Sequence, residues 1–72
     1  MNAIKLNFRH SLKTMNSQLK QHNEAVVCYG QGGKIVHEIR EEYEYSGKLT
    51  QTCAVFYNAK DCAEYINSRN GF

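Results

Sequence analysis

The sequence contains no proline and no tryptophan, and only five glycines and three cysteines in 72 residues. It has no apolar run long enough to cross a bilayer, so no membrane-spanning helix is expected. Its polar, basic beginning does not have the pattern of a secretory signal segment. The three cysteines form an odd and widely spaced set, whereas a secreted disulfide scaffold carries a dense and even one. We therefore expect a reducing, cytoplasmic setting.

Residue patterns that carry chemistry are also missing. Asp61 is the one aspartate, and its position is explained by capping of a helix. Glu41 and Glu42 are adjacent, so on a strand they point to opposite faces and make a poor acid–base pair. The segment 30–34 has the composition of a phosphate loop, but it lacks the spacing and precedes a strand. We expect no enzymatic activity and no cofactor.

Two cysteines are expected on the strands that flank His37. We interpret Cys28 and Cys53 as small residues of the core, because unpaired cysteine is among the most buried residue types. The alternative is a Cys–His–Cys metal site with Cys62 as fourth ligand. It lacks the short paired ligand spacing of structural zinc sites, and no metal is expected.

Nearly unbroken alternation of large and charged residues over 35–45 predicts a central strand with one buried face. An apolar run before it and Gly32-Gly33 predict a hairpin that places Cys28 opposite His37. A third strand is expected over 49–57. A three-residue loop at 45–47 is preferred, because it keeps the apolar residues of the two strands on one face.

This register makes specific pairs. It places Ile39 opposite Cys53 and His37 opposite Val55. A two-residue turn at Ser46-Gly47 would instead pair His37 with Phe56. The residues expected beneath the helices are Ile35, Ile39, Cys53 and Val55.

The ends of the chain predict further elements. Alternation of Ile4, Leu6 and Phe8 predicts a first strand over residues 3–9. Ser11 is a predicted N-cap of a helix that ends near Asn23, and Asn58 is a predicted N-cap of a second helix.

The expected order is therefore βαβββα, in a single α+β domain over residues 1–72. Two short helices would cover one face of a mainly antiparallel four-stranded sheet, as a two-layer sandwich. A chain of this length has a marginal hydrophobic core, which a homodimer or a bound partner could supplement.

The sheet face opposite the helices is the leading candidate for function, because it combines aromatic and charged side chains. We interpret the chain as a non-enzymatic protein-binding module. By analogy of size and style, we expect a phage or mobile-element accessory protein that inhibits a host nucleic-acid-binding complex. The same face could form the seam of a homodimer. The candidate partner-binding residues are Tyr29, Val36, Glu38, Arg40, Glu42 and Phe56.

The charge distribution supplies an alternative function. Residues 1–22 contain four basic residues and no acidic one, so Arg9, Lys13 and Lys20 are candidates for contact with nucleic-acid phosphates. Helix, three antiparallel strands and helix is also the element order of double-stranded-RNA-binding domains. The basic signature at the start of their final helix is absent from residues 59–64. Nucleic-acid binding is therefore the second hypothesis.

Overall fold

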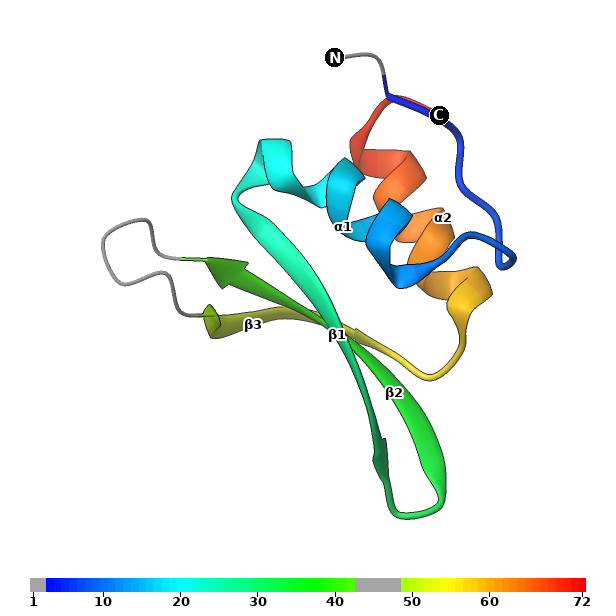
Figure 1. The fold of residues 1–72 in the computed structure, drawn as a ribbon, viewed down its shortest axis with the longest axis vertical. Helices are drawn as coiled ribbons and strands as arrows, with labels where there is room; N and C mark the ends of the chain where they lie inside the picture. The colour runs from blue at the N-terminus through cyan, green and yellow to red at the C-terminus, as the bar shows by residue number, and fades with distance from the viewer. Residues whose placement is uncertain (1–2, 43–48) are drawn as a thin grey trace.

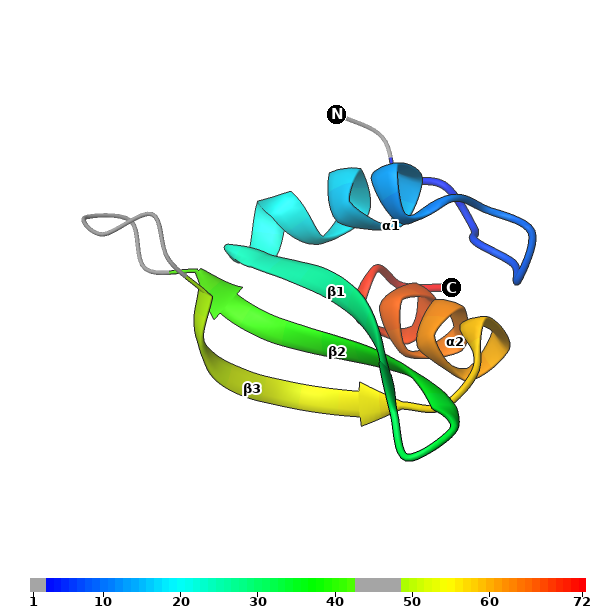
Figure 2. The same cartoon turned by 60° about the horizontal axis from the view of Figure 1, so that its bottom comes forward.

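The structure, a computed structural model, describes residues 3–42 and 49–72. The strands form one antiparallel sheet in the order β1-β2-β3, and both helices lie on the same side of it (Figures 1 and 2). The fold of the described residues is thus a small α+β arrangement. None of its helices is long and apolar enough to span a membrane. In chain order the elements are α1 (Leu12–Leu19), the 3-10 turn η1 (Lys20–His22), β1 (Glu24–Gln31), β2 (Lys34–Glu42), β3 (Leu49–Phe56) and α2 (Ala59–Arg69).

Both helices begin at the predicted caps. The Ser11 hydroxyl accepts a hydrogen bond from the Thr14 N–H at 3.2 Å, and the Asn58 side chain accepts one from the Asp61 N–H at 2.7 Å. Each satisfies a donor that the first helical turn would otherwise leave unpaired. Asn23 follows η1 with a φ of 57°, the left-handed conformation that asparagine tolerates.

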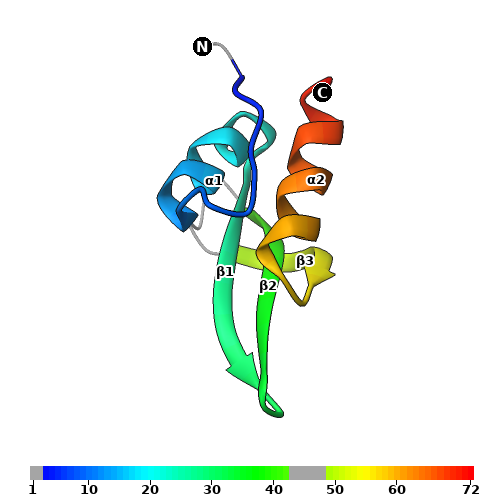
Figure 3. The same cartoon turned by 90° about the vertical axis from the view of Figure 1, so that its right-hand side faces the viewer.

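The predicted first strand over residues 3–9 is wrong. Residues 3–7 join no sheet, and residues 8 and 9 form a turn; the segment runs between α1 and α2 (Figure 3). The Asn67 carboxamide of α2 accepts from the Leu6 N–H at 2.7 Å and donates to the Leu6 C=O at 2.8 Å. Gln18 of α1 accepts from the Ile4 N–H at 3.0 Å. Side chains of the helices therefore take the place of a neighbouring strand, and the described order is α-β-β-β-α.

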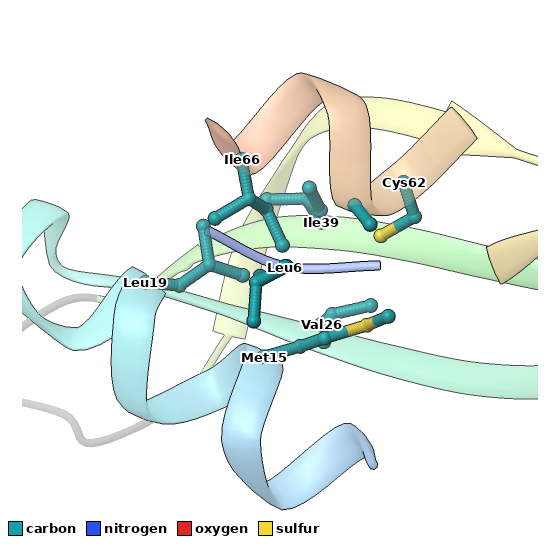
Figure 4. Packing of buried hydrophobic residues seen from close by; sticks show 8 residues of the cluster. Leu6, Met15, Leu19, Val26, Ile39, Cys62 and Ile66 are labelled. Atoms are coloured by element: carbon teal, nitrogen blue, oxygen red, sulfur yellow. The ribbon is translucent and has the colours of Figure 1, made fainter. Parts of the chain in front are cut away.

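The core lies between the helices and one face of the sheet (Figure 4). The side chains from the sheet are Val26 and Ile39, which face each other across β1 and β2. Burial of Ile39 beneath the helices confirms its prediction. Removal of these apolar side chains from water is the main drive for docking the helices. The core residues, each 4% exposed or less, are Leu6, Met15, Leu19, Val26, Ile39, Cys62, Ala63 and Ile66.

The β1–β2 hairpin has the predicted register. Gly32 and Gly33 have φ angles of 59° and 80°, which is the backbone of a type I′ two-residue turn. Cys28 lies opposite His37, as expected. Local turn chemistry was therefore sufficient to align these two strands.

The register between β2 and β3 agrees with the prediction at Glu41, which lies opposite Gln51, but differs from Ile39 onward. The ladder shifts between Ile39 and Arg40, so Ile39 faces Ala54 and His37 faces Phe56. This is a β-bulge, and it moves the following residues of β3 to the other face. Ala54 and Phe56 now pack against the core beneath the helices. The predicted connecting loop lies outside the described residues.

The prediction that Cys53, Val55 and Ile35 lie beneath the helices is wrong. Cys53 is exposed beside the bulge, and Val55 is turned away from the helices and is 42% exposed. Ile35 is 58% exposed, because the hairpin extends beyond both helices (Figure 3).

Candidate partner-binding face

Four of the six predicted partner-binding residues lie together on the sheet face that points away from the helices. They alternate along β1 and β2 with residues of the core, so their side chains point to the opposite side. Glu42 ends β2, and its side chain lies outside the described part. We call this surface the open face. Its residues are Val27, Tyr29, Val36, Glu38, Arg40, Thr52 and Val55.

Phe56 does not belong to the open face, contrary to the prediction. Its ring packs against Tyr65 of α2, with 5.3 Å between ring centroids, and it is partly buried against the core. The bulge in β3 causes this change of side. Replacement of Phe56 would therefore disturb the packing of α2, and Val55 takes its place on the open face.

Glu38 is the centre of a hydrogen-bond network on the open face. The Tyr29 hydroxyl donates to Glu38 Oε1 at 2.7 Å, and Arg40 Nη2 donates to the same oxygen at 2.9 Å. The Thr52 hydroxyl donates to Glu38 Oε2. These donors come from all three strands, so the network forms only when the sheet is assembled.

The network keeps a nearly buried carboxylate ionised. Glu38 is only 6% exposed. Hydrogen bonds from Arg40, then Thr52 and Tyr29, lower the pKa of Glu38 from 4.5 to about 2. The charge of Glu38 is therefore satisfied within the fold by donors of its own chain.

The accessible part of the open face is apolar and aromatic. Tyr29 is 38% and Val55 is 42% exposed, whereas Val36 is 2% exposed. The hydrogen bond from Tyr29 to Glu38 holds the tyrosine ring in one position. Tyr29, Val55 and the half-buried Arg40 can thus contact a partner directly. Val36 is buried and cannot.

The cysteines are arranged differently from the expectation. Cys28 and Cys53 are exposed, and Cys62 is buried. Burial raises the pKa of Cys62 to about 11, so its thiol stays protonated and unreactive at neutral pH. Cys28 Sγ lies 3.9 Å from His37 Nε2, but no three metal-ligating side chains converge in the described ranges. The alternative metal site therefore lacks its third ligand there.

The predicted nucleic-acid-binding residues lie on a separate surface. Arg9, Lys13 and Lys20 are all exposed. Lys13 and Lys20 are seven residues apart, which places them on one side of the α1–η1 segment. The Arg9 guanidinium lies 5.5 Å from the centroid of the Phe8 ring. Since α1 covers the other side of the sheet (Figure 2), these residues and the open face can be tested independently.

Comparisons of the chain with models of protein families, with curated proteins and with solved structures gave no match. Its two candidate surfaces therefore rest on their own geometry. They are the open face and the basic side of α1.

Proposed function

We propose that the chain is a non-enzymatic binding module whose open face contacts a protein partner. The observation that carries this proposal is Tyr29, an exposed ring whose hydroxyl is held by Glu38. A ring that is already fixed loses little side-chain freedom on binding, and tyrosine is a frequent anchor of protein interfaces. Val55 adds exposed apolar surface on the same face, and Arg40 adds a charge.

Truncation of the anchor should weaken binding strongly. Tyr29→Ala is expected to weaken the binding free energy by about 2 kcal/mol, which is about a 30-fold rise in Kd, because it removes the ring that the partner would bury. Tyr29→Phe keeps the ring but releases it from Glu38, so a smaller loss is expected. The partner would be captured from the native host, identified by mass spectrometry and titrated by calorimetry.

The matched control for this experiment is Lys13→Ala, which changes an exposed side chain on α1. Its affinity for the partner should equal that of the unmodified protein. Thermal unfolding would establish that Tyr29→Ala is folded at the assay temperature. Unchanged affinity of a folded Tyr29→Ala protein would refute the open face as the interface.

The wider role, inhibition of a host complex by a phage or mobile-element protein, extends this proposal. It is supported by the size of the chain and by analogy alone. An acidic strand could compete for a basic surface of such a complex. Because Glu38 is satisfied by its own neighbours, the apolar anchors carry more of the proposed interaction than this carboxylate does.

A second candidate function is binding of nucleic acid by the basic side of α1. It is favoured by the exposure of Arg9, Lys13 and Lys20, which form no ion pair within the described part of the chain. Exposed cations of this kind can displace the counterions of a phosphate backbone. The described elements also follow the helix, three strands, helix order of double-stranded-RNA-binding domains.

Removal of two of these charges should change the salt dependence of binding. With Lys13→Ala and Lys20→Ala together, affinity for generic duplex RNA or DNA is expected to fall. The slope of log affinity against log salt should become shallower by about 2. Fluorescence anisotropy at several salt concentrations measures both quantities, with Tyr29→Ala as the control that should bind normally. Absence of binding by the unmodified protein at low salt would eliminate this candidate.

A further inference from the structure

The two edges of the described sheet differ in how they are protected. An exposed edge strand presents unpaired N–H and C=O groups, which proteins shield with charges, proline, bulges or a covering element. β3 is interrupted by two register shifts. β1 pairs with β2 without a shift, and residues 25–31 contain neither charge nor proline. The edge of β1 therefore lacks the usual protection within its own sequence.

The fold covers only the first half of this edge. The two-residue turn makes Gln31 and Lys34 a hydrogen-bonded pair, so the odd-numbered residues of β1 direct their N–H and C=O groups toward β2. The N–H and C=O groups of the even-numbered residues therefore point away from β2. At Val26 these groups are satisfied by Asn16 of α1, which accepts from the N–H at 2.7 Å and donates to the C=O at 3.3 Å. The Asn16 carboxamide thus acts as a cap on the sheet edge.

The second half of the edge is open. Cys28 and Gly30 have the same orientation as Val26 and are exposed, and their outward backbone groups have no hydrogen-bond partner among the described residues. The turn end of the β1–β2 hairpin extends beyond the helices (Figure 3). No side chain of α1 caps them as Asn16 caps Val26.

We propose that this open half of β1 pairs antiparallel with the same segment of a second copy of the chain. A strand that pairs here needs free backbone groups at every second residue, and the chain's own Cys28–Gly30 segment offers them in a self-complementary arrangement. This inference goes beyond the proposed function, because it concerns the sheet edge and a different partner. The two sheets would become one continuous sheet.

The cap at Val26 determines the register of this pairing. A two-fold axis at Cys28 would place Gly30 opposite Val26 of the second copy, whose backbone groups Asn16 already occupies. An axis at Tyr29 instead pairs Cys28 with Gly30 of the second copy, and Gly30 with its Cys28. Both positions then form reciprocal N–H···O=C bonds. The proposed dimer is centred on Tyr29.

The side chains agree with this register on both faces. Gly30 lies opposite Ile35, which is 58% exposed. In the joined sheet Ile35, Gly30 and Cys28 of the second copy would lie in one row on the same face. On the open face Tyr29 lies opposite Tyr29 of the second copy, within the range of a cross-strand aromatic pair. The pairing therefore covers exposed apolar groups and leaves Val55 accessible.

Gly30→Pro tests the proposal directly. Proline removes the outward N–H, and the ladder with β2 keeps its bonds because this N–H does not point to β2. Gly30→Ala is the matched control, since its added Cβ meets only Lys34 O at 3.9 Å. In sedimentation equilibrium the unmodified protein and Gly30→Ala should dimerise alike, and Gly30→Pro should dimerise at least tenfold more weakly. A monomeric unmodified protein up to millimolar concentration, or equal dimerisation of Gly30→Pro, would overturn the proposal.

Amide hydrogen exchange tests it without a substitution. When about nine of ten chains are paired, the Cys28 and Gly30 amides should exchange about tenfold more slowly than in dilute solution. The Val26 amide is the internal control, because Asn16 protects it at every concentration. Dimerisation without slower exchange at Cys28 and Gly30 would place the interface elsewhere. Gly30→Pro retains Tyr29 and Val55, so its capture of the heterologous partner reports separately on the proposed function.

Discussion

Glu38→Gln is expected to lower the free energy of unfolding by about 2 kcal/mol at pH 7, because hydrogen bonds to a charged acceptor are stronger than those to an amide. Glu38→Lys should cost more, about 3 kcal/mol or above, since it leaves Arg40 unpaired and adds a second cation beside it. Urea denaturation measures both variants. Replacement of the exposed Glu64 by Gln is the control, and its stability should be close to that of the unmodified protein.

The contribution of Glu38 should depend on pH with a definite sign. Its folded pKa of about 2 lies below the ordinary value of 4.5, so the unfolded chain binds this proton more tightly. The stabilisation is fully present above pH 4.5 and is lost as the pH falls from 4.5 through 2. The stability difference between the unmodified protein and Glu38→Gln should therefore shrink across this window. An equal difference at pH 7 and pH 2 would contradict the network as its cause.

Asn67→Ala is expected to destabilise the fold by about 2–3 kcal/mol, because it leaves the buried N–H and C=O of Leu6 without partners. Asn67 is 7% exposed and Leu6 is 4% exposed, so water cannot readily replace the lost amide. The extended N-terminal segment should then detach from the helices. Urea denaturation gives the loss in stability, and trypsin cleavage at Lys5 and Arg9 should become faster.

Ser68→Ala is the matched control for this experiment, since Ser68 is the exposed neighbour of Asn67 on α2. Its cleavage rate and its stability should both remain close to those of the unmodified protein. If the Leu6 amide of Asn67→Ala exchanged as slowly as before, the carboxamide would not be what holds the segment.

Local sequence alone determined the ends of the helices and the first hairpin. Ser11 and Asn58 cap helices as expected, and Gly32-Gly33 aligns β1 with β2. In each case the interacting groups are a few residues apart, so the chemistry of a short segment is sufficient. Four residues of the open face also followed from the alternation along these two strands.

Tertiary packing alone decided which elements the N-terminal segment contacts, on which side of the sheet Phe56 lies, and which donors bind Glu38. Alternation of Ile4, Leu6 and Phe8 specifies an extended chain but not its neighbour, which is Asn67, 61 residues away from Leu6. The β3 bulge turns Phe56 to the helix side of the sheet, where it meets Tyr65 of α2. The network of Glu38 could not be read from the sequence, because its donors Tyr29 and Thr52 lie on other strands. Such contacts form only after distant segments meet, so no local pattern specifies them.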